Sequence, residues 1–398
     1  MKEVYLDNNA TTKVDERVLE KMLPYLKENY ANPSSMYNTA RISAKAIEKA
    51  REQVADFLGA EDKETVIFTS CATEGANTAI KGIVEQFSTP ENNHIITTQV
   101  EHPCVLSTYE YLEKKGMRAT YIGVNENGEL NIDNLLSKVT PQTILVSIMH
   151  ANNETGAIYP VYDIAREVKK INSNTKVFVD GVQAAGKINI NLKDSDIDFY
   201  SISGHKFHAP KGVGALYVKK GNLFQPFMLG GHQEHSLRAG TQNTPYIVGL
   251  GEAARLAKES LNYELTEVKR LRDKLETGIL KALNNAKLNS KSKERVPNTT
   301  NIGFEYIEGE LILLYLNDLG IYASSGSACT SGSLDPSHVL RAQKVPFTSL
   351  HGSIRFSLSR FTTEDEIDFA IENVPKVIKK LAEISPFQDE LKGLGLLN

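Results

Sequence analysis

The chain has 398 residues, of which 41% are hydrophobic and 24% charged, with a formal net charge of -4 and a pI of about 6.2. This length allows one large core and a smaller one, and the mild acidity provides no strong field for nucleic acid or an anionic membrane. The N-terminus has no long apolar run and three cysteines are too few for a disulfide framework, so we expect a cytoplasmic protein with free thiols, no signal peptide and no membrane span.

Short apolar runs alternate with amphipathic segments over the first two thirds of the chain. The runs that predict strands are residues 65–69, 94–97, 143–148, 176–180, 197–202 and 214–218. Most are continuous rather than alternating, which is typical of strands buried on both faces of a mainly parallel sheet. Residues 39–58 and 163–170 have helical spacing, and Gly59 is a plausible helix stop. The alternation predicts an open α/β sheet.

The pattern changes after about residue 255. Residues 252–285 form a long, charged helical stretch, and a second helix is predicted at residues 363–381, capped by Thr362 or Thr363. Three further strands are predicted, at residues 298–304, 320–323 and 353–358. Residues 287–295 are polar and predict a solvated surface loop. This part indicates a smaller α+β domain.

Two residues at the ends of neighbouring predicted strands carry the clearest chemistry. Lys206 follows an apolar strand, where a lysine with a lowered pKa can hold a carbonyl cofactor as a Schiff base; a surface lysine or a phosphate contact is the alternative. Asp180 ends a strand, where open α/β sheets bind ligands, and it can pair with a protonated ring nitrogen or simply cap a loop. About one βα unit separates them, so adjacent strands would bring them together.

Polar residues follow other predicted strands. Residues 70–77 open a helix in a way that suits an anion, although taken alone they favour an ordinary capped helix. Ser203 and His205 can add phosphate donors. His102 can stack on a planar ring or shuttle protons, or can simply be a histidine satisfied in a loop. Residues 151–156 would place amide donors at the same edge of the sheet. Because several predicted strands end in polar residues at this edge, the sequence predicts one ligand site there.

The thiols differ in their surroundings. Cys329 lies among Ser and Gly residues that cannot build a core and are typical of a flexible loop, although it can also be a small buried hydrophobe. Its reactivity would require a thiolate. Cys71 and Cys104 lie beside candidate site segments, but their neighbours indicate packed thiols. Arg355, on a predicted strand, suits a substrate carboxylate or a structural ion pair.

The motifs that contain these residues resemble those of a known family nearly end to end. They are residues 5–12, 72–74, 101–102, 152–156, 180–183, 203–206, 238–241 and 325–329. With them the chain resembles the cysteine desulfurases of the NifS/IscS type, class V aminotransferases of fold type I. Residues 230–234 are similar to the NifS branch. The segment around Cys329 is similar to that of members whose mobile cysteine delivers sulfur to a scaffold.

The resemblance implies an aspartate aminotransferase-like α/β fold. A large domain of residues 15–255 would bind pyridoxal 5'-phosphate, and residues 1–14 with 256–398 would form a small α+β domain carrying Cys329. The implied reaction converts L-cysteine to L-alanine and leaves sulfur on Cys329 as a persulfide for iron–sulfur cluster assembly. The implied partners are a second copy in a homodimer and a NifU/IscU-like scaffold protein as sulfur acceptor. No intrinsic metal is implied, although Cys329 could transiently ligate a cluster with the scaffold.

Individual roles follow from the same resemblance. Lys206 would hold the cofactor as an internal aldimine and then remove the Cα proton, Asp180 would pair with the pyridine nitrogen, and His102 would stack on the ring and assist proton transfer. The implied phosphate contacts come from Ala72, Thr73, Ser203, His205 and, across the dimer, Thr241. Asn153 and Gln183 would contact the ring hydroxyl side, and Arg355 with Asn153 would bind the substrate.

Two residues depart from the family pattern: Cys71 stands where relatives usually have Gly, and His235 where they commonly have Arg. Other fold type I enzymes remain alternatives, namely a selenocysteine lyase or a small-amino-acid aminotransferase, as does a non-enzymatic regulatory or assembly partner. Cys329 in a flexible loop disfavours an aminotransferase, and disfavours a selenocysteine lyase less. The intact set of Lys206, Asp180, His102 and Cys329 argues against a non-enzyme.

Overall fold

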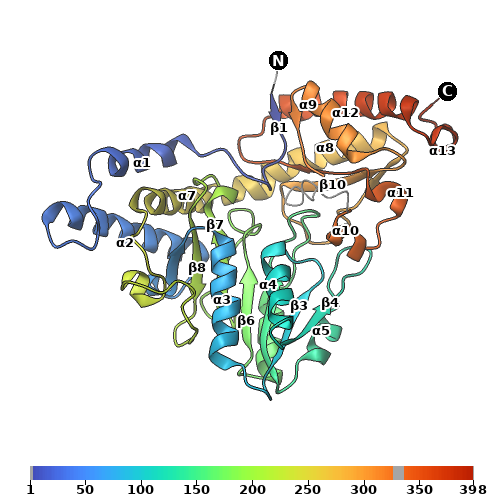
Figure 1. The fold of residues 1–398 in the computed structure, drawn as a ribbon. Coiled ribbons are helices and arrows are strands. Elements are labelled where there is room, and N and C mark those ends of the chain that lie inside the picture. Colours follow the sequence, from blue (N-terminus) through green and yellow to red (C-terminus); the bar gives the residue numbers. More distant parts are fainter. Residues whose placement is uncertain (1–2, 326–335, 398) are drawn as a thin grey trace.

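A seven-stranded sheet forms the centre of the computed structural model, which describes residues 3–325 and 336–397 (Figure 1). Its strands lie in the order β2-β8-β7-β6-β5-β3-β4, and all neighbouring pairs are parallel except the two made by β8. The strands are β2 (Val66–Thr69), β3 (His94–Thr98), β4 (Arg118–Ile122), β5 (Thr143–Met149), β6 (Lys176–Asp180), β7 (Phe199–Ser203) and β8 (Gly214–Val218). The prediction of a mainly parallel sheet is confirmed.

Helices cover both faces of this sheet, which explains the continuous apolar runs. In β6, Val177 and Val179 belong to one core while Phe178, between them, belongs to another. The first core packs the sheet against α1 (Glu16–Lys27), α2 (Asn38–Leu58), α5 (Ile132–Lys138), α6 (Val161–Ile171) and α7 (Thr244–Tyr263). The second packs it against α3 (Ala72–Phe87) and α4 (Pro103–Glu113). Burial on both faces therefore removes the alternating pattern of a half-exposed strand.

The predicted elements of this region are found with small shifts in their ends. The segment predicted from residue 197 begins as β7 at Phe199, and α2 ends at Gly59, whose φ of 58° closes the helix. The strand β4 was missed. It lies at the edge of the sheet with exposed and half-buried residues, so its sequence has no continuous apolar run.

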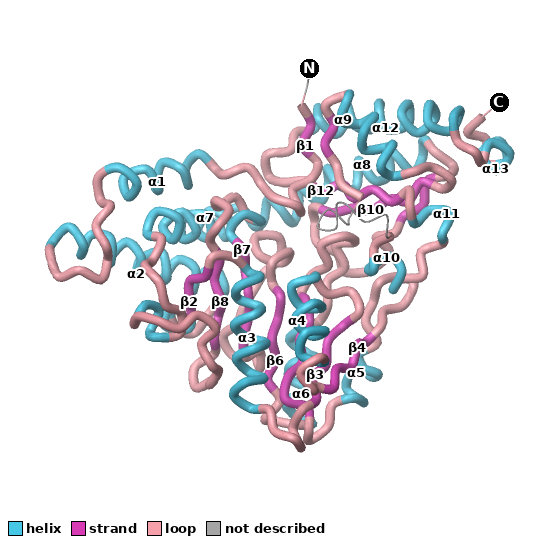
Figure 2. Tube along the Cα trace, viewed as in Figure 1, coloured by secondary structure: helices cyan, strands magenta, loops and turns pink. Residues whose placement is uncertain are grey.

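A second group of elements lies beyond one end of the large sheet (Figure 2). These elements pack around their own apolar core. Three strands form an antiparallel sheet in the order β12-β10-β9, and β1 pairs with β11 in a separate parallel ribbon. The elements of this group are β1 (Val4–Tyr5), α8 (Lys269–Ala282), β9 (Ala286–Leu288), β10 (Thr299–Phe304), α9 (Gly309–Asp318), β11 (Ile321–Tyr322), β12 (Ser353–Ser357), α12 (Glu364–Ile384) and α13 (Gln388–Gly393). Two short helices, α10 (His338–Ala342) and α11 (Phe347–Leu350), lie between β11 and β12 in the chain, and Val339 of α10 belongs to the first core of the large sheet. The predicted domain boundaries stay a prediction.

The polar segment at residues 287–295 was wrongly predicted to be a solvated loop. Its start belongs to β9, which pairs with β10, and Asn289 and Ser290 are buried. The Asn289 side chain donates to Asn301 Oδ1 and to Ser353 Oγ, both at 2.9 Å. Side-chain hydrogen bonds to neighbouring strands therefore allow polar residues to be buried here.

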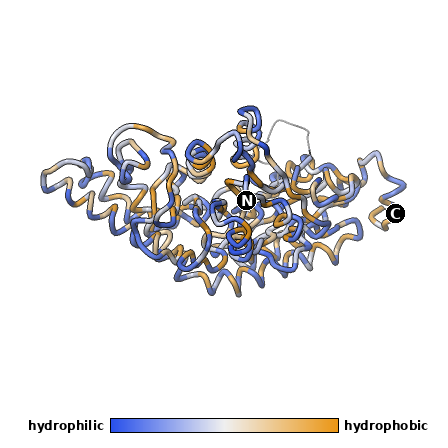
Figure 3. The backbone as a smooth tube through the Cα atoms, turned by 90° about the horizontal axis from the view of Figure 1, so that it is seen from below, coloured by the Kyte–Doolittle hydropathy of each residue, from blue (hydrophilic) through white to orange (hydrophobic). Residues whose placement is uncertain are grey.

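The long helical stretch is continuous from Thr244 to Ala282, with a π-helical turn at Glu264–Val268 between α7 and α8. Helix α12 begins after Thr363, which forms a capping box with Glu366, so Thr363 is the cap. Figure 3 shows hydrophobic and hydrophilic residues alternating along the outer helices, as expected of helices with one buried face. Within residues 3–325 and 336–397, no helix has the length and apolarity to cross a membrane.

Candidate functional site

A cavity of about 380 Å³ lies at the carboxyl ends of the parallel strands, between the large sheet and the sheet that contains β12. Met149, Asp180 and Ser203, the last residues of β5, β6 and β7, line it. Arg355 of β12 lines it from the other side. This is the place where open α/β sheets bind ligands.

Lys206 is held in the cavity by the N-terminal segment of the chain. It ends the short turn Gly204–Lys206 that follows β7. Its Nζ donates to the carbonyl oxygens of Asn9, at 2.6 Å, and Ala10, at 2.8 Å. Main-chain oxygens thus fix the position of the amine at the edge of the cavity.

Asp180 lines the same cavity as Lys206 and is itself buried. Its Oδ1 accepts a hydrogen bond from the Val182 N–H at 3.0 Å, so the loop-capping alternative is also realised. Burial raises the pKa of Asp180, while the nearby His102 and Lys206 oppose that rise. A cationic ligand group at this carboxylate would reduce the cost of its burial.

The glycine after Asp180 is required by packing. A Cβ atom at Gly181 would lie 1.8 Å from a ring carbon of Tyr200. The Tyr200 hydroxyl lies 2.8 Å from Nδ1 of His150, and this buried hydrogen bond fixes the position of the ring. The backbone beside Asp180 therefore rests directly on an aromatic ring.

His102 is the N-cap residue of α4, and its Nδ1 accepts a hydrogen bond from the Cys104 N–H at 3.1 Å. Because Nδ1 accepts, a neutral His102 carries its proton on Nε2. Burial lowers the pKa of His102, which favours this neutral form. The ring both caps a helix and lines the cavity.

The N-terminus of α3 also meets the cavity. Cys71, Ala72 and Thr73 line it, and Cys71 is the N-cap residue without a side-chain hydrogen bond to the first turn. The Glu74 carboxylate is engaged by Arg238 at 2.7 Å and by the Ser70 N–H at 2.8 Å. The helix end therefore presents small residues and its positive dipole to the cavity, an arrangement that suits a phosphate.

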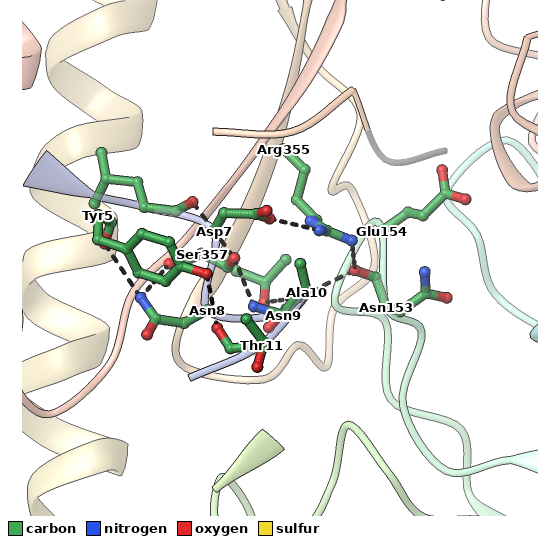
Figure 4. A network of polar contacts seen from close by, with 12 residues as sticks. Tyr5, Asp7, Asn8, Asn9, Ala10, Thr11, Asn153, Glu154, Arg355 and Ser357 are labelled. Carbon is green, nitrogen blue, oxygen red and sulfur yellow. Dashed lines mark hydrogen bonds and ion pairs between the residues drawn. The ribbon is translucent and has the colours of Figure 1, made fainter. Parts of the chain in front are cut away.

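Arg355 forms a structural ion pair and also lines the cavity, so both of the roles that the sequence left open are possible for it. Its guanidinium contacts Asp7 Oδ1 at 2.7 Å and donates to the Asn153 carbonyl oxygen at 3.0 Å (Figure 4). It lines the cavity as well, and its Nε has no hydrogen-bond partner among the described residues. The ion pair with Asp7 therefore orients the Arg355 guanidinium at the wall of the cavity.

Asn9 is a central residue that the sequence interpretation did not assign. Besides accepting from Lys206, it donates through Nδ2 to Thr299 Oγ1 at 2.8 Å and to the Asn153 carbonyl oxygen at 3.1 Å. Its own N–H donates to Ser357 Oγ at 2.9 Å (Figure 4). Asn9 lies in the motif at residues 5–12, which indicated the family but did not indicate a role for Asn9.

The structure brings most of the predicted site residues to this one cavity. They are Ala72, Thr73, His102, Asn153, Asp180, Gln183, Ser203, His205, Lys206 and Arg355. Thr241 is exposed and is not among the lining residues, and Cys329 lies outside the described residues. Their roles stay predictions.

The thiols of Cys71 and Cys104 were interpreted as packed, but both residues line the cavity and are only partly buried. Burial raises the pKa of Cys104 well above its usual value, so this thiol stays protonated at neutral pH. No cluster of three or more His, Cys, Asp or Glu side chains within the described ranges is arranged to hold a metal ion.

Comparisons with known proteins agree with this geometry. The sequence model of the family described as Aminotransferase class-V matches residues 4–369. A cysteine desulfurase of a Nostoc species is 53% identical over 99% of this chain and 97% of its own length. Cysteine desulfurase NifS of Azotobacter vinelandii is 49% identical over 97% of this chain and 95% of its own.

A solved structure described as a NifS-like protein has a TM-score of 0.90 and 40% identity, and the match covers 96% of this chain and 100% of the solved one. These matches confirm the resemblance to NifS-type cysteine desulfurases that the motifs indicated, and with it the fold type. Because the family match spans nearly the whole chain and relatives match at about half identity from end to end, the chain belongs to the class-V aminotransferase family.

Proposed function

We propose that this protein is a cysteine desulfurase that converts L-cysteine to L-alanine, transfers the sulfur to Cys329 as a persulfide and supplies iron–sulfur cluster assembly. The observation that carries the proposal is the meeting of Lys206, Asp180, His102 and Arg355 in one cavity. Relatives named cysteine desulfurase, matched from end to end, support the same reaction.

The residues of the cavity fit pyridoxal 5'-phosphate. A helix N-terminus suits its phosphate, a buried carboxylate suits a protonated ring nitrogen, and a lysine amine suits its aldehyde. Bound there, the cofactor supplies a carbonyl for the substrate amine and a ring that takes up an electron pair. The proposed contacts are Ala72, Thr73, Ser203 and His205 at the phosphate, Asp180 at the ring nitrogen, His102 at the ring face, and Asn153 and Gln183 at the ring hydroxyl.

The chain's own groups then have separate tasks. Arg355, held in place by Asp7, binds the substrate carboxylate with Asn153 beside it. Lys206 Nζ removes the proton from Cα, since it lies at the cavity edge and is a base when deprotonated. His102 is neutral because of burial and assists proton transfer.

Cys329 lies outside the described residues, but both ends of its segment are tied beside the cavity. Ser324 exchanges backbone hydrogen bonds with Arg355 of 2.6 and 3.2 Å. His338 Nε2 donates to the Glu101 carbonyl oxygen at 2.9 Å, next to His102. In the proposed step the Cys329 thiolate attacks the substrate sulfur, so an S–S bond forms, the Cβ–S bond breaks, and alanine leaves once Cβ takes a proton.

We also propose a homodimer in which Thr241 completes the phosphate site of the other subunit. Its exposure on this chain, outside the chain's own cavity, supports this placement. A NifU/IscU-like scaffold is the proposed sulfur acceptor, with which Cys329 could transiently ligate a cluster. A relative named cysteine desulfurase NifS supports the sulfur-releasing reaction on which this partner would depend.

The test separates cofactor chemistry from sulfur chemistry. Cys329→Ser should keep the yellow bound cofactor and still bind L-cysteine, because Lys206, Asp180 and Arg355 remain. It should form no persulfide and release no alanine, because a hydroxyl is a poor nucleophile toward sulfur at neutral pH. Mass spectrometry after addition of L-cysteine, with an alanine assay, measures both.

Cys71→Ser and Cys104→Ser are the matched controls and should keep most of the activity. Added sulfur on Cys71 or Cys104, or normal turnover without Cys329, would overturn the assignment. Comparing L-cysteine with L-selenocysteine in the same assay separates the proposed function from a selenocysteine lyase. An absence of alanine with both substrates would favour a non-enzymatic role.

A further inference from the structure

Lys187 is a buried lysine that the proposed reaction does not use. Only 5% of it is exposed, although lysine is rarely buried without a counter-charge. It follows Gly186, whose φ of 75° turns the chain inward, and a Cβ atom at Gly186 would lie 3.1 Å from Cβ of Phe207. Gly186 therefore packs closely against Phe207, the residue that follows Lys206.

The Lys187 amine contacts two residues of the cavity. Its Nζ donates to Gln183 Oε1 at 2.5 Å and to Asn9 Oδ1 at 3.4 Å. A protonated lysine can only donate, so in its charged form Lys187 fixes Gln183 with Oε1 toward it. Gln183 Nε2 then donates to the Asn9 carbonyl oxygen at 3.0 Å. The orientation of the amide is thus decided by Lys187.

The same carbonyl oxygen of Asn9 accepts from Lys206 at 2.6 Å. Lys187, Gln183, Asn9 and Lys206 therefore form one continuous hydrogen-bonded chain that starts in the interior and ends at the cavity. Asn298 Nδ2 donates to Asn9 Oδ1 at 3.1 Å and holds Asn9 from the other side. A substitution of Lys187 can therefore affect Lys206 through two intervening residues, Gln183 and Asn9.

A small second cavity borders both Lys187 and Lys206. Lys187, Lys206, His208, Glu264 and Arg360 all line it. Glu264 begins the π-helical turn between α7 and α8, and such turns are frequent at functional sites.

The charges that face Lys187 come from several elements. Burial, together with the charges of Lys206 and Arg355, lowers the pKa of Lys187 to about 7, and the charge of Glu264 opposes this shift. Burial raises the pKa of Glu264 to about 7. Lys187 in turn acts on His205 and His208, whose pKa values burial already lowers. The amine therefore carries a partial positive charge close to Lys206 at neutral pH.

We propose that Lys187 is a positioning residue for the cofactor pocket, which orients the Gln183 amide and, through Asn9, holds the amine of Lys206. The proposal rests on the proposed function, in which Lys206 carries the cofactor. Its distinctive consequence is that removing a buried side chain outside the cavity changes the acid–base behaviour of Lys206.

The first measurement uses the protein without cofactor. Competitive acylation of lysines, followed by mass spectrometry across pH, gives the apparent pKa of Lys206 directly. In Lys187→Met this pKa should rise by about 0.5 unit or more, because a neighbouring positive charge is removed. Lys219→Met is the matched control, since Lys219 donates to Ser195 at 2.6 Å in another part of the fold.

The second measurement uses the holoenzyme. The pH midpoint of the bound-cofactor absorbance should rise in Lys187→Met, and the cofactor should dissociate about tenfold faster, as for the loss of one charge-assisted hydrogen bond. Lys187→Gln, which keeps a donor for Gln183 but no charge, should raise the Lys206 pKa while retaining the cofactor better. If Lys187→Met does not fold, the Lys187→Gln variant alone tests the proposal.

An unchanged Lys206 pKa and absorbance midpoint in both variants would overturn the inference, even if both are less stable. Borohydride reduction of the wild type provides the separate check of the proposed function. It should fix the cofactor on the Lys206 peptide, whereas label on Lys211 would overturn that function instead. The two failures are therefore distinguishable.

Discussion

At the scale of single residues, Glu101 shows how burial sets the state of a carboxyl group. It is fully buried beside His102, and its Oε1 accepts from Thr98 Oγ1 at 2.7 Å and from the Met149 N–H at 3.0 Å. Its Oε2 has no hydrogen-bond partner among the described residues. Burial, with a smaller contribution from the charge of Asp180, raises the pKa of Glu101 to about 8, although the hydrogen bonds from Thr98 and Met149 act in the opposite direction. The group is therefore protonated at neutral pH, and it ties β3 to β5 as a neutral acid.

We predict that Glu101→Gln reduces the loss of stability toward alkaline pH. Between the ordinary pKa of 4.5 and about 8, the unfolded chain releases the Glu101 proton while the folded chain keeps it. The free energy of unfolding therefore falls as pH rises through this window, by at most about 1.4 kcal/mol per pH unit from this group. Glutamine stays neutral and keeps the oxygen that accepts both hydrogen bonds.

The measurement is the melting temperature from pH 5 to pH 9 for both proteins. The melting temperature of the variant relative to the wild type should increase toward pH 8 and then level off. The exposed Glu91→Gln is the control. A difference that stays constant with pH would show that Glu101 is ionised in the fold.

At the scale of elements, a buried ion pair joins α2 to the segment at residues 230–241. Arg51 contacts both carboxylate oxygens of Glu234, at 2.6 and 3.0 Å, and each side chain is 2% exposed. The Phe68 N–H donates to Glu234 at 2.9 Å. Glu234, His235 and Ser236 all have positive φ, a conformation that costs energy outside glycine. The ion pair therefore holds a strained segment that leads to Thr241.

We predict that Glu234→Gln lowers the free energy of unfolding by about 3–5 kcal/mol, because Arg51 would remain buried without its counter-charge. Chemical denaturation of the holoenzyme measures the loss. Glu52→Gln is the matched control. Glu52 contacts Lys63 at 3.0 Å with 60% of its side chain exposed, so its loss should cost about 1 kcal/mol or less. Equal effects of the two substitutions would contradict the role given to the buried pair.

His235, at which the sequence resemblance predicted an arginine, has its Nε2 2.9 Å from a Glu64 carboxylate oxygen. The imidazole can donate a hydrogen bond from Nε2 to this carboxylate at an exposed site.

At the scale of the whole molecule, large apolar side chains remain exposed on this chain. Met36 and Tyr30, in the connection between α1 and α2, are 90% and 81% exposed, and Leu229, just before the segment at residues 230–241, is 84% exposed. Figure 1 shows α1 and α2 projecting from one side of the body. Such surfaces are typical of subunit interfaces, which supports the proposed dimer.

We predict that the protein sediments at twice its 44.0 kDa chain mass, and that Leu229→Asp weakens both the dimer and cofactor retention. Sedimentation velocity, combined with cofactor absorbance in each fraction, links the two effects. Leu314→Asp is the control, because Leu314 is also exposed but lies on α9. A stable monomer that retains its full cofactor would contradict the shared phosphate site.

The sequence alone determined the fold class and most of the candidate site. Continuous apolar runs indicated strands buried on both faces, and Asp180 and Lys206 stood at strand ends, where local pattern and position along the chain are sufficient evidence. The edge strand β4 and the buried start of the segment at residues 287–295 were missed, because their burial depends on neighbours rather than on local periodicity.

Only the tertiary structure decided how the reactive residues are held. Asn9 meets Lys206 across 197 residues, Lys187 across 178 and Asn298 across 289. No spacing in the sequence predicts these contacts, because they arise where the N-terminal segment crosses the end of the sheet. Residue types and local periodicity therefore specify the chemistry, whereas the meeting of distant segments specifies the geometry and charge in which that chemistry takes place.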